Sequence, residues 1–340
     1  MTIGIAVVGL GMAHKPHIRS LRELDHRVRI VACHTPSAIR RATFTKAHPD
    51  LAVTADLSAV LDDAKVDAVI LLTPPMTHAD LVARCAEARK HVLLEKPLDV
   101  TVDRATGSVE LMEQASLRFG VVLQHRFREA SRKLASVLQR EELGDLVSAS
   151  AWVRWWRPPE YFAEPGRGMK ARDGGGVLLT QAIHTLDLFQ SLAGPIVQVA
   201  AMAKTSPLRR IDTEDVVAAA VRFDNGAIGT IDATTVSFPG FPEKIELACV
   251  KGTAVLEAES LTVFYRDGRI LRHEGGESRS GGSDPMAFSH EAHKALLVDF
   301  LDAIEEGRDP IVSGREALKV HYLIDALLQS SDTGEMRTIR

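Results

Sequence analysis

Two side chains in this sequence are suited to moving a proton at a hydroxyl group, Lys96 and His184. Lys96 directly precedes Pro97, and a residue before proline is held in an extended conformation. His184 lies in a helical pattern in which Thr180, His184 and Asp187 share one face. An imidazole is a workable base near neutral pH, and Asp187 would fix its tautomer. Together, an imidazole and an ammonium provide what alcohol oxidation needs, a proton acceptor and a positive charge beside the developing alkoxide.

The chain also carries a glycine turn of the kind that binds a dinucleotide. The apolar run Ile3–Val8 leads into the turn, and Pro16 follows early in the next helical pattern. The first glycine would permit the tight turn, and the second would let backbone N–H groups approach a pyrophosphate. His14 replaces the third small residue of the fingerprint, so either Ala13 provides the close approach of helix to strand or the helix lies further out. The residues predicted to contact the cofactor here are Gly9, Leu10, Gly11, Met12 and Ala13.

The residues after the second predicted strand bear on the choice between NAD and NADP. An NAD-specific site usually has a carboxylate there for the ribose 2′-hydroxyl. This chain instead has Val28–Cys33 followed by His34 and Thr35, with Arg40 and Arg41 next. Hydroxyl and guanidinium groups would tolerate a 2′-phosphate, so we expect NAD or NADP, with NADP slightly favoured and with Thr35 and Arg40 in contact with it. Two arginines on a solvated helix face are the ordinary alternative.

The elements that must position these side chains change character along the chain. Up to residue 123, short apolar runs alternate with helical patterns, which predicts a parallel sheet covered by helices. Lys96 follows one of these runs, His91–Leu94, at the edge of an open α/β sheet where ligands bind. A lone lysine after a strand would otherwise be a surface charge. The predicted strands are Ile3–Val8, Val28–Cys33, Val66–Leu72, His91–Leu94 and Gly120–Leu123.

The second half of the chain predicts longer strands joined by tight turns. Asp224-Asn225-Gly226, Lys251-Gly252 and Asp267-Gly268 are hairpin signals, so we expect a large, open, mainly antiparallel sheet arranged as a meander. A strong helix, Gly176 to about Leu192, interrupts it, and Gly275–Ser283 is expected to be a mobile surface loop. The predicted domains are 1–123, a Rossmann domain, and 124–340, a substrate and oligomerisation domain closed by helices near His290–Glu306 and Gly314–Ser331.

Composition excludes several classes of protein. The 340 residues are 45% hydrophobic and 25% charged, with a net charge of -4, so neither disorder nor a membrane protein is expected. No basic run suggests a nucleic-acid partner. The N-terminus runs directly into a strand and has no basic segment, which argues against a signal or transit peptide. The widely spaced Cys33, Cys85 and Cys249 predict three buried, unpaired thiols and a cytoplasmic location.

Two pairs of histidines have a spacing that could place both rings on one metal ion. His14 with His17, and His290 with His293, are pairs three residues apart, but neither lies in a set of carboxylates typical of zinc enzymes. We therefore predict solvated helix faces and no metal.

Aromatic and basic residues near one strand exit are candidates for a substrate pocket. Trp155 and Trp156 would offer flat faces to a sugar ring, although alternation along a strand should bury half of such a cluster. Arg126 follows the last parallel strand and would reach the same pocket, with a linker role as the alternative. Weaker candidates are Gln124, Trp152, Arg154, Arg157, Tyr161 and Arg167.

Three motifs occur in the order and spacing of one known group. They are Thr73-Pro74-Pro75-Met76-Thr77-His78, Lys90 to Glu95-Lys96-Pro97, and Gly174-Gly175-Gly176 to His184 and Asp187. The chain resembles, over nearly its whole length, the family of glucose-fructose oxidoreductase, inositol 2-dehydrogenase and the MocA proteins. The resemblance implies a Rossmann domain, an open-faced sheet domain and a nicotinamide cofactor, acting on a hydroxyl of a sugar, polyol or inositol. It also implies cofactor contacts from Thr73, Pro74, Pro75, His78, Glu95, Lys96 and Pro97.

Residue by residue, the resemblance assigns Lys96 to the reacting carbon and His184 to the general acid or base. Two departures, Thr180 where these dehydrogenases commonly have Asp and Arg89 where a glycine is frequent, leave the substrate open. Substrate contacts are predicted for Lys96, Arg126, Trp155, Trp156, Thr180, His184 and Asp187. In the predicted strand Ala227–Val236, apolar residues occur at the positions that face each side of the sheet. This predicts a homo-dimer or homo-tetramer that forms through the open sheet face. The alternatives are an NAD-dependent glycosidase acting by oxidation and elimination, and a ligand-sensing regulator on the same scaffold.

Overall fold

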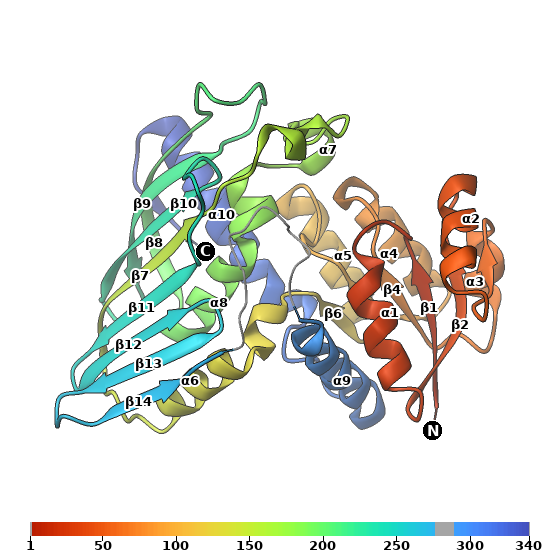
Figure 1. The fold of residues 1–340 in the computed structure, drawn as a ribbon, viewed down its shortest axis with the longest axis horizontal. Coiled ribbons are helices and arrows are strands. Elements are labelled where there is room, and N and C mark those ends of the chain that lie inside the picture. Colours follow the sequence, from red (N-terminus) through yellow and green to blue (C-terminus); the bar gives the residue numbers. More distant parts are fainter. Residues whose placement is uncertain (1, 276–288, 340) are drawn as a thin grey trace. The chain divides into compact units, whose positions relative to one another are not determined.

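The computed structural model describes residues 2–275 and 289–339 of the chain (Figure 1). Its contacts divide the chain into two compact units, each formed from two segments. Unit 1 consists of 1–122 and 290–318, and unit 2 of 123–289 and 319–340. The first boundary agrees with the predicted one, whereas residues 290–318, predicted to belong with the second domain, are compact with unit 1.

Unit 1 is built on a six-stranded sheet in which every pair of neighbours is parallel. The strand order is β3-β2-β1-β4-β5-β6, so the predicted Rossmann fold is confirmed. Strands such as β4 are buried at every position because helices cover both faces of a parallel sheet. The strands are β1 (Ile3–Val8), β2 (Val28–His34), β3 (Val53–Thr54), β4 (Ala68–Leu71), β5 (His91–Leu94) and β6 (Phe119–Val121).

Helices connect these strands, and one helix reaches unit 1 from the far end of the sequence. α9 (Glu291–Glu306) packs against α1 (His14–Glu23). At Gly120 an added Cβ would lie 3.1 Å from the Phe300 ring of α9, so the glycine in β6 allows this close approach. This packing explains why α9 joins the first unit. The remaining helices are α2 (Ala38–Ala47), α3 (Leu57–Asp62), α4 (His78–Glu87) and α5 (Val102–Gln114), with the 3-10 turn η1 (Pro75–Thr77) before α4.

Unit 2 is built on a nine-stranded sheet in the order β14-β13-β12-β11-β7-β10-β9-β8-β15. The predicted hairpins are present, but the predicted simple meander is wrong at the centre of the sheet. There β7 (Leu146–Arg154) pairs in parallel with β10 (Ile228–Thr234), and the chain between them contains a helical segment followed by two further strands. The other strands are β8 (Ile196–Lys204), β9 (Val216–Phe223), β11 (Lys244–Cys249), β12 (Gly252–Glu257), β13 (Ser260–Tyr265), β14 (Ile270–His273) and β15 (Arg337–Thr338).

The helices of unit 2 pack against one face of this sheet (Figure 1). α8 (Ile183–Ala193) contacts β7 and β11, and α6 (Glu129–Gln139) contacts β12 and β13. A π-helical turn, η4 (Leu178–Ala182), leads into α8. Shorter elements are η2 (Gln124–Phe127), η3 (Pro159–Ala163) and α7 (Lys170–Asp173), and the long α10 (Gly314–Thr333) spans both units in sequence.

Two further expectations concern the thiols and a loop. Cys33, Cys85 and Cys249 are free, as predicted, but Cys249 is half-buried because it ends β11. Burial raises the pKa of the Cys33 and Cys85 thiols to about 12, so both are protonated and unreactive. The predicted loop Gly275–Ser283 lies outside the described residues, apart from Gly275.

Candidate functional site

The two glycines of the turn after β1 differ in how closely other residues approach them. Gly9 has φ +104°, and a Cβ there would lie 2.6 Å from the backbone of Leu72. At Gly11 an added Cβ would meet no atom within 4 Å. None of the described residues therefore requires glycine at this position, whereas a dinucleotide seated on the N-terminus of α1 would require the space. Leu10 is buried, Met12 is 59% exposed and Ala13 directly precedes the helix. These residues fit a dinucleotide.

His14, the departure from the fingerprint, contacts both α2 and the glycine turn. Its ring packs against Phe44 of α2 at a centroid distance of 5.1 Å, and Nδ1 lies 2.5 Å from the Gly11 carbonyl oxygen. Burial lowers the pKa of His14. His14 is half-buried, and the buried residues of α1 begin with Pro16.

The end of β2 presents backbone and guanidinium groups together. Thr35 is buried, and the Arg41 guanidinium donates to the Thr35 and Pro36 carbonyl oxygens at 2.9 and 2.8 Å. Ser37 caps α2 by accepting from the Arg40 N–H, and the Arg40 side chain is exposed. An arginine is therefore fixed at the loop after β2, one position beyond the residue that the sequence predicted.

The loops after β4 and β5 are joined by one buried imidazole. His78 has no exposed surface, and its Nδ1 and Nε2 lie 2.9 Å from the carbonyl oxygens of Pro97 and Thr73, respectively. Burial lowers the pKa of His78. Pro75 begins η1 between these loops, with Pro74 exposed beside it. His78 thus holds the Thr73 and Pro97 loops in register, and its predicted contact with a cofactor stays a prediction.

Lys96 lies at the carboxyl end of β5, half-buried, in the position expected from the sequence. Its backbone N–H donates to Oε2 of the preceding Glu95 at 3.0 Å. Oε1 of Glu95 lies 3.4 Å from Nε2 of His17.

In unit 2, the helix that carries His184 is anchored at its start by Glu214. The Glu214 carboxylate accepts from the N–H groups of Gly176 and Leu178, both at 3.0 Å. A Cβ at Gly176 would lie 1.8 Å from the Glu214 carbonyl oxygen, so this glycine is needed for the contact. Burial, only partly offset by these backbone hydrogen bonds, raises the pKa of Glu214. Sequence reasoning missed Glu214, because the chain between the two segments gives no signal of the contact.

The polar stripe predicted on this helix is present in a modified form. The π-turn at 178–182 inserts an extra residue before His184, so the predicted regular α-helical spacing from Thr180 is wrong. Thr180 is half-buried, and its hydroxyl donates to the Gly176 carbonyl oxygen at 2.7 Å. His184 is buried, and its ring stacks on His125 with centroids 4.9 Å apart. His125, on η2, is a neighbour that the sequence analysis did not select.

Asp187 and Arg126 form a buried pair. The Arg126 Nε and Nη2 donate to the two Asp187 oxygens at 2.8 and 2.6 Å, and the Asp187 side chain is 1% exposed. Bidentate pairs of this kind fix both side chains. The structure therefore gives each of these two predicted substrate residues a protein partner, and the role of Asp187 in orienting His184 stays a prediction.

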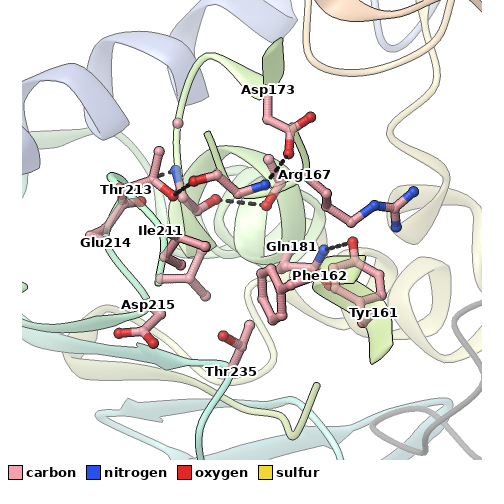
Figure 2. A pocket seen from close by; sticks show the side chains of 15 residues that line it. Tyr161, Phe162, Arg167, Asp173, Gln181, Ile211, Thr213, Glu214, Asp215 and Thr235 are labelled. Atoms are coloured by element: carbon pink, nitrogen blue, oxygen red, sulfur yellow. Dashed lines mark hydrogen bonds between the residues drawn. The ribbon is translucent and has the colours of Figure 1, made fainter. Parts of the chain in front are cut away.

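A pocket opens beside the start of this helix (Figure 2). Figure 2 shows Gln181 donating to the Tyr161 hydroxyl at 2.7 Å, with Arg167 beside the Tyr161 ring. Gln181 also accepts from Arg157 Nε at 3.0 Å. The weaker candidates Tyr161 and Arg167 thus line the pocket together with Thr180.

The two predicted tryptophans differ in exposure. Trp155 is buried, with the Arg157 guanidinium over its ring, and Trp156 is half-buried, with Arg209 over its ring and Phe238 at its edge. Strand alternation therefore places the two rings in different surroundings, as expected.

The predicted solvated histidine faces are wrong. His17, His290 and His293 are 1%, 6% and 3% exposed, because α1 and α9 pack together in unit 1. His17 and His293 with Glu95, and His290 with Glu23 and Glu291, place potential ligand atoms within 4.8 Å of one another.

Comparisons with known proteins agree with this geometry. A family model described as an oxidoreductase family with an NAD-binding Rossmann fold matches residues 3–123, and a GFO/IDH/MocA C-terminal domain model matches residues 131–255. The chain is similar to the myo-inositol 2-dehydrogenase of Thermotoga maritima, with 24% identity over 325 residues that cover 92% of this chain and 91% of that protein.

Solved structures are similar over the whole chain. The WlbA dehydrogenase from Bordetella pertussis, in complex with NADH and UDP-GlcNAcA, is 26% identical with a TM-score of 0.85, covering 100% of this chain and 99% of that one. A levoglucosan dehydrogenase in complex with NADH and levoglucosan has a TM-score of 0.90 at 21% identity, covering 100% of both chains, which supports the fold. In the part of the chain that the model describes, no helix has the length and apolar character to cross a membrane.

Proposed function

The chain belongs to the GFO/IDH/MocA oxidoreductase family, and from that membership we propose that it interconverts a hydroxyl of a sugar, polyol or inositol and the corresponding ketone or lactone. The observation that carries the proposal is the placement of the Gly9–Gly11 turn and of Lys96 at the same carboxyl edge of the unit 1 sheet. When bound, the nicotinamide dinucleotide supplies the acceptor or donor of the hydride. The N-terminus of α1 and the Gly11 space would hold its pyrophosphate.

Lys96 and His184 would act on the same substrate hydroxyl. An ammonium at Lys96 would stabilise the alkoxide oxygen, and the imidazole of His184 would take the hydroxyl proton during oxidation and return it during reduction. His125 and the Glu214 anchor would keep the His184 ring in place. Relatives that bind UDP-GlcNAcA or levoglucosan support a carbohydrate as the class of substrate.

The experiment is a screen of sugars, inositols and sugar acids with both nicotinamide cofactors, followed at the nicotinamide absorbance band. Purified protein is first tested for bound dinucleotide. Lys96→Met and His184→Ala should each lower kcat by at least about a hundredfold, the usual contribution of a positioned acid or base. Normal turnover in both variants would refute the assignment. Release of product without net NADH would instead indicate the oxidation and elimination chemistry of a glycosidase.

We also propose that the cofactor site accepts NADP. Its support is the exposed Arg40 and the Arg41 guanidinium fixed at the loop after β2. Arg40→Ala should raise KM for NADP and leave KM for NAD unchanged, whereas a strong preference of the wild type for NAD would contradict the proposal.

A second copy of the chain is proposed to cover the open face of the unit 2 sheet. Met202, Ile228 and Phe264 are 82%, 64% and 44% exposed on β8, β10 and β13, three strands that also carry buried side chains. Light scattering should show a dimer or tetramer, and a monomer would remove the proposal.

A further inference from the structure

One buried cluster of unit 1 lies next to Lys96 in sequence and has no role in the mechanism above. It joins His17 of α1, His293 of α9 and Glu95 at the end of β5, with potential ligand atoms all within 4.8 Å of one another. The two imidazole rings are perpendicular, with centroids 5.3 Å apart. Both histidines are almost fully buried, and the Glu95 side chain is 16% exposed. We call these three residues the His-Glu-His cluster.

The cluster holds a negative charge at Glu95. Burial alone would raise the pKa of this carboxyl, but the hydrogen bond from His17 and the nearby charges of His17, Lys96 and His293 lower it overall. The two oxygens of the carboxylate face different partners. Oε1 lies 3.4 Å from His17 Nε2, and Oε2 accepts the backbone N–H of Lys96 at 3.0 Å. The carboxylate therefore links His17, whose ring contacts that of His293, to the backbone from which the Lys96 side chain extends.

Two histidines and one carboxylate are also a set that binds zinc. In a tetrahedral zinc site with bonds of about 2.05 Å, two ligand atoms lie about 3.3 Å apart. This distance is close to the separation of Glu95 Oε1 from His17 Nε2. However, a divalent ion would add two positive charges directly beside the residue that must carry an ammonium. The hydrogen bond to the Lys96 backbone also requires the carboxylate and gives it a task without a metal.

We propose that His17 and His293 are positioning residues that hold Glu95 and, through it, the backbone of Lys96. The inference rests on the proposed function of Lys96. Because α1 also begins beside the glycine turn, the same helix that would carry the pyrophosphate fixes the position of the lysine. The placement of the lysine is thereby tied to the dinucleotide turn.

The same pair of helices supplies a matched control. At the end of α1, the Glu23 carboxylate lies 2.7 Å from Nε2 of His290, the residue before α9, and 2.8 Å from Nζ of Lys294 in the first turn of α9. Lys294→Met therefore perturbs the contact between α1 and α9 without touching Glu95. His17→Leu and His293→Leu remove the imidazoles, and His17→Gln retains an N–H donor that can reach the carboxylate.

The test measures turnover, cofactor affinity and hydrogen exchange of the Lys96 amide on full-length protein. We expect His17→Leu and His293→Leu to lower kcat about tenfold with little change in KM, as for a loss realised in the transition state. The Lys96 amide should exchange about tenfold faster, which corresponds to about 1.4 kcal/mol of lost protection. His17→Gln should restore most of both properties, and Lys294→Met should change neither.

Several outcomes would overturn the inference. If the leucine variants match Lys294→Met in kcat and in Lys96 exchange, the histidines only support helix packing. If the wild type binds one equivalent of Zn²⁺ and His17→Leu does not, the cluster is a metal site. Exchange at Lys96 is measured without substrate, so it tests the inference even if the wild type turns over no alcohol, and that result would count against the proposed function alone.

Discussion

Alanine at Gly9 and alanine at Gly11 should separate the packing role of the glycine turn from its binding role. At Gly9, φ is +104° and the new Cβ would lie 2.6 Å from the Leu72 backbone, which cannot move without shifting β4. A left-handed conformation costs an L-residue roughly 1–2 kcal/mol, and overpacking adds about 1–3 kcal/mol. Gly9→Ala should therefore lower the free energy of unfolding by about 2–5 kcal/mol.

At Gly11 the same substitution meets no atom within 4 Å. Its backbone lies outside the left-handed region, so alanine should leave the stability of the free protein unchanged or raise it by up to about 1 kcal/mol. The methyl group would nevertheless occupy the space above the start of α1. We expect the Kd for NADH to rise at least about tenfold, or about 1.4 kcal/mol.

The assay combines urea unfolding of the free protein with a fluorescence titration of NADH. Gly107→Ala is the control, because this glycine lies inside α5 and also has nothing within 4 Å of an added Cβ. It should stabilise the protein by up to about 1 kcal/mol and leave NADH affinity unchanged. The reasoning fails if Gly11→Ala destabilises the free protein as much as Gly9→Ala, or if it binds NADH like the wild type.

Three other contacts give predictions of their own. Arg126→Met removes both guanidinium hydrogen bonds from the buried Asp187 carboxylate and should cost about 3–5 kcal/mol in urea unfolding, most of it recovered when Asp187→Leu is added; no loss would contradict a buried pair. Glu214→Ala removes two backbone hydrogen bonds at the start of the His184 helix. It should lower the free energy of unfolding by about 1–3 kcal/mol and also lower kcat. A fully active variant would exclude the anchoring role of Glu214. Hydrogen bonds from Lys294 and His290 lower the pKa of Glu23 from 4.5 to about 2. The wild type should therefore have a higher Tm than Glu23→Gln at pH 7, and this difference should disappear as the pH falls from about 4.5 to about 2. A difference in Tm that does not depend on pH would refute the prediction.

The sequence predicted the Rossmann half well because its signals are local. Buried parallel strands read as short apolar runs, and the turn after Val8 needs glycine for reasons of close packing. In the second half, hairpin turns identify sequential neighbours. No local signal marks the pairing of β7 with β10, because the residues that join are about 80 positions apart in the chain.

The buried histidines show a different limit. His17 precedes Leu21 and Leu24 at helical spacing, and His293 precedes Leu296, Leu297 and Phe300, so both lie on apolar stripes that the sequence already contains. The spacing between the histidines predicts solvated faces, whereas these stripes predict the burial that the structure shows. That the two stripes meet at Glu95 depends on α9 returning to the first unit, and the hydrogen bonds at the start of the His184 helix come from the distant Glu214.

The central strand β7 has a consequence for how unit 2 assembles. Hairpins alone can form β8 to β10 and, separately, β11 to β14, but these two ribbons join only where both pair with β7. β7 emerges from the ribosome before either ribbon and has no sheet neighbour until they arrive. The full nine-stranded sheet therefore forms only after strands that are far apart in the sequence have paired. This predicts slow refolding, in which both ribbons form before the complete sheet.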